Sequence, residues 1–214
     1  DGEAENSQSN TFGLLVTVIP VNDTPVMDSI ADTSTNEDTP LTITVSSSDV
    51  DTGTGNGDEN TPTYSAVSSS PDDVAVSIND DQLTMEPVLD FHGDVMITVT
   101  VTDDGGLSNA ADFILAVTPV NDTPVMDAIA DTSTNEDTPL TITVSSSDVD
   151  TGTGNGDENT PTYSAVSSSP DDVAVSINDD QLTMEPVLDF HGDVMITVTV
   201  TDDGGLSNAA DFIL

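Results

Sequence analysis

The sequence of 214 residues contains no lysine and no arginine, although it carries 41 aspartates and glutamates. The formal net charge is therefore −41, and self-repulsion of that size opposes any compact state. The same charge excludes nucleic acid and anionic membrane surfaces as partners, because both repel an acidic chain. With no lysine or arginine and only two histidines in the chain, cations from outside it are needed to neutralise the acids.

Cysteine and tryptophan are also absent, and aromatic residues make up only 3% of the chain. Disulfides therefore cannot hold the fold together. Few aromatics combined with a high net charge are typical of disordered chains, so the pattern of apolar residues has to decide between order and disorder. No apolar run approaches the ~20 residues of a membrane-spanning helix, and no signal peptide is visible in the sequence.

The sequence does contain a long internal repeat. Residues 21–115 return as residues 120–214 with a single difference, Ser29 against Ala128, at an offset of 120 − 21 = 99 residues. A repeat of this length is a whole domain. We expect residues 1–20 to be the C-terminal strand remnant of a preceding repeat, followed by repeats at 21–119 and 120–214. This organisation predicts a longer array with a mechanical or multivalent role.

Alternation with a period of two dominates each repeat, and no stretch has a helical period. Leu41, Ile43 and Val45 alternate with polar residues, as do the apolar residues of 95–101. About seven short strands are expected per repeat, near Val26–Ile30 and at 41–45, 64–67, 74–78, 83–85, 95–101 and 113–117. Asn79-Asp80-Asp81 predicts a hairpin turn. The pattern predicts an all-β fold of two tandem antiparallel β-sandwiches of the immunoglobulin-like type.

The acidic and amide residues gather in the loops between these strands. Each repeat has clusters around Glu37, Asp49-Val50-Asp51, Asp90 and Asp103-Asp104, and a further cluster, Val120-Asn121-Asp122-Thr123-Pro124, joins the two repeats. Any one of these motifs alone is usually a solvated turn, and His92 is interpreted as a turn residue. Together they offer only oxygen ligands, which is the donor set that calcium prefers. We therefore expect Ca²⁺ as the cofactor.

The order of these motifs resembles that of a known family. Glu37, Asp49-Val50-Asp51-Thr52-Gly53, Tyr64-Ser65, Leu89-Asp90, Asp103-Asp104-Gly105-Gly106-Leu107-Ser108 and Asn121-Asp122-x-Pro124 are similar to the ordered calcium motifs of cadherin repeats. The resemblance is closest to the cadherin-like tandem repeats of giant bacterial surface adhesins of the RTX type. It covers the whole 99-residue unit, twice.

The resemblance implies that calcium lies at the junctions between successive repeats. For the junction between the two complete repeats it implies the ligands Glu37, Asp90, Asn121, Asp122, Asp148, Asp150 and Asp202. For the junction with a preceding repeat it implies Asn22, Asp23, Asp49, Asp51 and Asp103, and for the next junction Glu136 and Asp189. The sequence departs from the cadherin pattern at His92, His191, Pro119 and Thr123. We therefore expect fewer ions per junction than in cadherins, two rather than three.

The expected function is that of a spacer, a calcium-stiffened extender that holds a distal adhesion domain away from a bacterial cell. The expected location is extracellular, and the expected partners are neighbouring repeats and other copies of the chain. One alternative is a module that binds sugar or another such chain. A second is a filament or matrix subunit in which residues 1–20 insert as a strand into a neighbouring molecule. An enzyme is the least favoured class, because no nucleophile–histidine pair and no phosphate-binding loop is present.

Overall fold

The structure is a computed structural model, and it describes residues 13–19, 21–50, 61–150 and 160–214. These residues contain strands and no helix. The strands are β1 (Val26–Met27), β2 (Thr33–Asn36), β3 (Leu41–Thr44), β4 (Ser47–Ser48), β5 (Thr63–Ser68), β6 (Val74–Asn79), β7 (Gln82–Pro87), β8 (Gly93–Thr102), β9 (Ser108–Thr118), β10 (Val125–Met126), β11 (Leu140–Thr143), β12 (Ser146–Ser147), β13 (Thr162–Ser167), β14 (Val173–Asn178), β15 (Gln181–Pro186), β16 (Met195–Thr201) and β17 (Ser207–Ile213).

The strands of the first unit form two main sheets. One has the order β2-β9-β8-β5 and the other the order β3-β7-β6, while β1 and β4 make a separate short pair. Alternate residues of β7, β8 and β9 point inward, so that Leu83, Ile97 and Leu115 are fully buried. This alternation is what the sequence predicts, and it confirms an all-β sandwich built almost entirely from antiparallel pairs.

The expected hairpin between residues 78 and 83 is present. Asn79 pairs with Gln82, which leaves Asp80 and Asp81 as a two-residue loop between β6 and β7. Asp80 has a φ of 53°, a left-handed conformation that aspartate tolerates better than most residues. The turn chemistry read from the sequence therefore fixes the register of this hairpin.

Strand β2, like the two-residue strand β4, is an element that the sequence did not predict. It pairs in parallel with the end of β9, Thr33 with Leu115 and Asn36 with Thr118. Its residues are Thr, Ser, Thr and Asn, so no apolar alternation marks it as a strand. The strand expected near Val26–Ile30 is correspondingly shorter than predicted and covers only Val26 and Met27.

The second unit repeats this architecture with a core of its own. Its sheets have the orders β13-β16-β17 and β11-β15-β14, with β10 and β12 as the short pair. Residues 132–135 correspond to β2 but form no strand, although Thr132 N still donates to the Ile213 carbonyl at 2.9 Å. In the first unit, the residues that pair with β2 are 115–118, at the end of β9.

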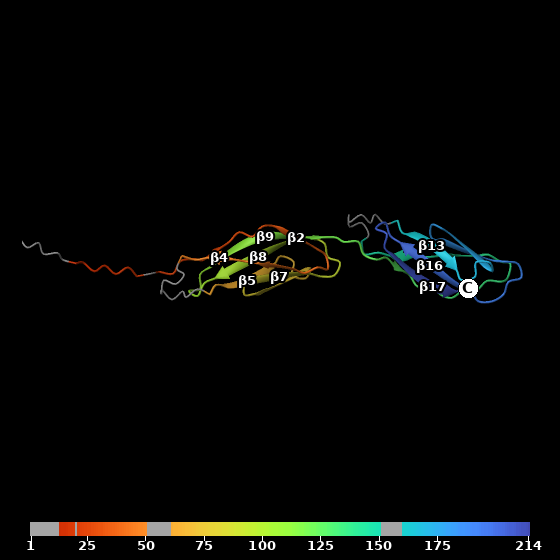
Figure 1. The fold of residues 1–214 in the computed structure, drawn as a ribbon, viewed down its shortest axis with the longest axis horizontal. Coiled ribbons are helices and arrows are strands. Elements are labelled where there is room, and N and C mark those ends of the chain that lie inside the picture. The colour runs from red at the N-terminus through yellow and green to blue at the C-terminus, as the bar shows by residue number, and fades with distance from the viewer. Residues whose placement is uncertain (1–12, 20, 51–60, 151–159) are drawn as a thin grey trace, which may run out of the picture.

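Figure 1 shows the two sandwiches one after the other along the long axis of the molecule, joined by the linker, residues 119–124. Residues 13–19 run away from the first sandwich in the direction opposite to the second (Figure 1). They form no strand, and Leu14, Leu15 and Val18 are more than four-fifths exposed. The prediction that residues 1–20 are a strand remnant stays a prediction.

Candidate metal site between the two units

The upstream side of the junction is built around Glu37, which directly follows β2. Its backbone N–H donates to the Thr118 carbonyl at 2.9 Å, so the parallel pairing of β2 with β9 places Glu37 where the linker begins. The side chain is only 4% exposed. Its Oε1 accepts a hydrogen bond from Val120 N–H at 2.5 Å, and its Oε2 lies 3.9 Å from His92 Nδ1.

Two further aspartates of the first unit lie beside Glu37. Asp38 and Asp90 both have left-handed backbones, with φ of 58° and 59°. Asp38 Oδ1 accepts a hydrogen bond from Asp90 N–H at 3.0 Å, which ties the two loops together. The resemblance to cadherins pointed to Asp90 and did not point to Asp38. Only the conformation of the loop brings the Asp38 carboxylate into the site.

The linker donates two hydrogen bonds to carboxylates of the second unit. Asn121 Nδ2 donates to Asp202 Oδ2 at 3.1 Å, and Asp122 N–H donates to Asp150 Oδ2. Asp150 is 2% exposed and Asp202 is 8% exposed, so both carboxylates are buried under the linker. Asp148 belongs to the same loop, where its Oδ1 accepts a hydrogen bond from Asp150 N–H at 3.1 Å.

These contacts bring together carboxylates from both units and the linker. Oxygens of Glu37, Asp122 and Asp150 lie within 4.8 Å of one another, and so do oxygens of Asp38, Asp90 and Asp122. Asp122 is common to both groups, and no lysine or arginine exists in the chain to pair with any of them. The pKa of Asp122 is raised above its ordinary value, first by burial and then by the neighbouring carboxylates, those of Asp150, Asp90, Asp38 and Glu37.

The donor set fits a hard divalent cation. All the candidate ligands are oxygens, and five carboxylates lie close enough to share ions. Asn121 Oδ1 is buried and has no hydrogen-bond partner, and Asn22 Oδ1 is in the same situation at the start of the first unit. A buried acceptor normally accepts a hydrogen bond from a donor. A buried amide oxygen that has no such donor and lies next to a carboxylate cluster is therefore suited to coordinate a cation.

The residues predicted for the other two junctions lie at the two ends of the molecule. At the start of the first unit, Asn22 Nδ2 donates to Asp103 Oδ2 at 3.1 Å, repeating the contact of Asn121, while Asp23 is exposed and Asp49 is half-buried. Asp51 lies outside the described residues. At the far end, Glu136 and Asp189 are both exposed, in contrast to Glu37 and Asp90. The linker packs only on the first of these two acidic pairs.

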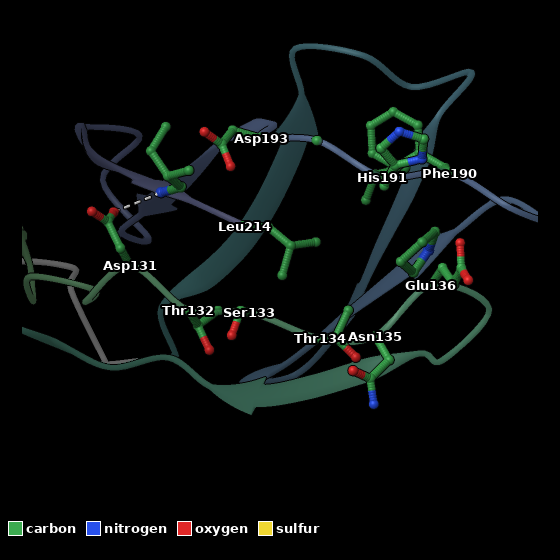
Figure 2. A pocket seen from close by; sticks show the side chains of 14 residues that line it. Asp131, Thr132, Ser133, Thr134, Asn135, Glu136, Phe190, His191, Asp193 and Leu214 are labelled. Atoms are coloured by element: carbon green, nitrogen blue, oxygen red, sulfur yellow. Dashed lines mark hydrogen bonds between the residues drawn. The ribbon is translucent and has the colours of Figure 1, made fainter.

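A groove lies at the far end of the second unit. It has a volume of about 630 Å³ and is lined by residues 131–136, Phe190, His191 and Leu214, among others. Figure 2 shows Thr132 to Asn135 along one side, with Phe190 and His191 across from them and Leu214 between. In the first unit, the corresponding space is closed by the end of β9, where Val117 is buried.

Comparison with known protein families agrees with this architecture. Residues 22–115 and 121–214 each match the family described as bacterial Ig domain. The chain belongs to the bacterial Ig domain family. Both units of this bacterial Ig protein are therefore immunoglobulin-like domains. No protein of curated function matches the sequence.

Solved structures with similar folds are cadherin ectodomains. Mouse cadherin-23 EC22-24 has a TM-score of 0.54 and 21% identity, covering 89% of this chain and 63% of that one. Protocadherin gamma B2 domains 1-5 has a TM-score of 0.54 and 18% identity, covering 91% of this chain and 39% of that one. The bacterial Ig chain thus spans less than two thirds of either structure. At these identities the similarity concerns the fold, a tandem of cadherin-like sandwiches.

The described residues contain no helix of the length and apolar character needed to cross a bilayer.

Proposed function

We propose that this tandem bacterial Ig chain is a calcium-stiffened spacer, an extender segment of a large bacterial surface adhesin that projects a distal adhesion domain. The observation that carries the proposal is the convergence of five carboxylates from two units and their linker, in a chain with no lysine or arginine. The resemblance to the repeats of giant bacterial adhesins supports the same conclusion. The proposed location is accordingly extracellular, at the bacterial cell surface.

The junction residues would act as a clamp that depends on the cation. Glu37, Asp38 and Asp90 would contribute from the first unit, Asn121 and Asp122 from the linker, and Asp148, Asp150 and Asp202 from the second unit. Calcium, when bound, would supply the positive charge that this set of acids lacks. Without it the carboxylates repel one another across the junction, so the two units are expected to separate and the linker to bend.

The calcium affinity of such a clamp determines whether it is occupied inside or outside a cell. Extracellular modules that bind calcium through carboxylate loops have dissociation constants of about 10⁻⁴–10⁻³ M. The junction would therefore fill outside a cell, where calcium is at that level, and stay empty in the cytoplasm. Binding to the folded, closed form also stabilises it in proportion to RT ln(1 + [L]/Kd). Calcium thereby replaces the disulfides that the sequence lacks.

Small-angle X-ray scattering of the 214-residue chain across a calcium titration tests the proposal. We expect calcium to narrow the distribution of interdomain distances and to hold the maximum dimension at its extended value, and chelator to reverse both effects. Asp122→Asn should weaken this response, whereas Asp23→Asn, the same change at an exposed position, should not. Identical scattering in calcium and in chelator would refute the spacer mechanism.

A different observation favours a second candidate function, assembly into filaments by strand insertion. Residues 13–19 precede the first unit, are exposed and form no strand, and the groove in the second unit is lined by residues 132–135, which correspond to β2. Val18 precedes the buried Val117 by 99 residues, so it matches the side chain that fills this space in the first unit. A copy of residues 17–19 in the groove of another molecule would extend its sheet by strand addition.

This second candidate predicts head-to-tail association that a filled groove prevents. Analytical ultracentrifugation should show concentration-dependent self-association, and Val18→Asp should abolish it. A chain extended by Ala-Val-Thr after Leu214, copying residues 116–118, should also remain monomeric because the groove is then occupied within the molecule. A monomeric parent chain at all concentrations would exclude the filament function and leave the spacer function untouched.

A further inference from the structure

The turn that follows β8 and β16 contains a glycine whose role is not explained by its backbone. Each turn has the sequence Asp-Asp-Gly-Gly. The second glycine, Gly106 or Gly205, has a φ of 88° or 90° and needs the conformational freedom of glycine. The first glycine, Gly105 or Gly204, is not among the residues with positive φ. The backbone at this position would therefore accept any small residue.

What excludes a side chain at the first glycine is the linker asparagine. A Cβ placed on Gly204 would lie within 2.5 Å of three atoms of the Asn121 side chain, Nδ2, Cγ and Oδ1. At Gly105 the same three atoms of Asn22 would lie 2.5, 2.6 and 2.8 Å away. Real Cβ atoms do not approach other atoms this closely, so the amide plane lies directly on the glycine backbone. The contact recurs at both units.

The side-chain amide of Asn121, which lies against Gly204, is also fixed in its rotation. Asn121 Nδ2 donates to Asp202 Oδ2 at 3.1 Å and to the Asp122 carbonyl at 3.3 Å. Asp202 is itself held, because its Oδ1 accepts a hydrogen bond from Leu206 N–H at 2.8 Å. With both acceptors on the Nδ2 side, Oδ1 is forced to the opposite side, where it is buried and has no hydrogen-bond partner.

We propose that Gly204, and equally Gly105, is a positioning residue for calcium that forms the seat on which the linker asparagine presents its Oδ1 to the cation. This inference rests on the proposed calcium function and adds a specific determinant of it. The seat is built from the downstream unit, because Asn121 contacts Asp202 and Gly204 there, just as Asn22 contacts Asp103 and Gly105 in the first unit. The ligand is thus oriented before the upstream unit closes on the ion.

The experiment is a calcium titration by calorimetry on the 214-residue chain and four variants, Gly204→Ala, Asn121→Ala, the double variant and Gly205→Ala. Gly204→Ala should weaken one class of junction sites by about tenfold or more, the effect typical of losing a group that orients a metal ligand. In the Asn121→Ala background the same glycine change should have no further effect. Gly205→Ala strains the turn but places no atom against Asn121, so the calcium affinity of this variant should match that of the parent chain.

A second measurement tests the contact between Gly204 and Asn121 in the absence of metal. In chelator, the side-chain amide resonances of Asn121 should move in Gly204→Ala and stay in place in Gly205→Ala. The inference is overturned if Gly204→Ala binds calcium as tightly as the parent chain, or if its effect persists undiminished in the Asn121→Ala background. A parent chain that binds no calcium overturns the proposed function itself, which is a separate outcome of the same titration.

Discussion

Replacing Glu37 by glutamine should change the stability of the first unit in opposite directions with and without calcium. Glutamine has nearly the same shape, and its Oε1 can still accept the hydrogen bond from Val120 N–H. The substitution therefore removes a charge and leaves the packing of a side chain that is 4% exposed. The repeat supplies a matched control, because Glu136 stands in identical local sequence but is exposed and has no linker packed on it.

The size of the effect follows from the geometry of the cluster. Glu37 has an oxygen within 4.8 Å of oxygens of Asp122 and Asp150. At that separation two unit charges repel by about 0.9 kcal/mol in the dielectric of water and about 3.5 kcal/mol at an effective dielectric of 20. Without metal, the loss of this repulsion should stabilise the closed junction by about 1–3 kcal/mol. With calcium, the loss of a carboxylate ligand should destabilise it instead.

Differential scanning calorimetry of both variants, in chelator and in millimolar calcium, measures this reversal. For domains of this size 1 kcal/mol corresponds to about 4–8 °C in Tm. Glu37→Gln should melt above the parent chain in chelator and below it in calcium, while Glu136→Gln should follow the parent chain in both. Equal behaviour of the two variants would refute the reasoning, because their sequence surroundings are the same and only the junction differs.

Two further predictions concern pH and the core. The pKa of Asp122 is raised in the folded protein above its ordinary 3.8. At pH values between the unfolded and the folded pKa, the folded form therefore binds more protons than the unfolded form. In chelator, the free energy of unfolding should consequently fall as pH rises through that window. Melting curves at several pH values should show a smaller pH dependence for Asp122→Asn than for Asp23→Asn. Leu83→Ala and its counterpart Leu182→Ala each remove a fully buried side chain from a separate core, at a cost of about 2–5 kcal/mol. Calorimetry in chelator should show each variant lowering the Tm of one unit only, and a shift of both transitions together would contradict the independence of the cores.

Most of the fold could be predicted from the sequence because its strands are marked by apolar alternation. Strands β3, β6, β7 and β8 all carry inward-facing residues at every second position, and the turn at Asp80 is made of turn-forming residues. Strand β2 escaped prediction because its four residues are polar and its pairing is with a strand about 80 residues away. Pairing between segments so far apart along the chain depends on the tertiary fold, which no local pattern records.

The candidate site divides in the same way. The residue types at Glu37, Asp122 and Asp150 indicate calcium from their order along the chain. Asp38 enters the site only through a left-handed backbone and a hydrogen bond to the loop of Asp90. The sequence also gives no reason for the first glycine of the Asp-Asp-Gly-Gly turn, whereas the structure places the Asn121 amide against it.

The sequence by itself determined the repeat, the β architecture and an unpaired excess of acid, since each of these follows from residue type and spacing alone. Tertiary structure decided which acids meet. The same position of the repeat is buried in the first unit and exposed in the second, as Glu37 and Glu136 are. The physical reason is that the site forms between units: it needs a second sandwich and the linker on top of it, and no single copy of the repeat contains both.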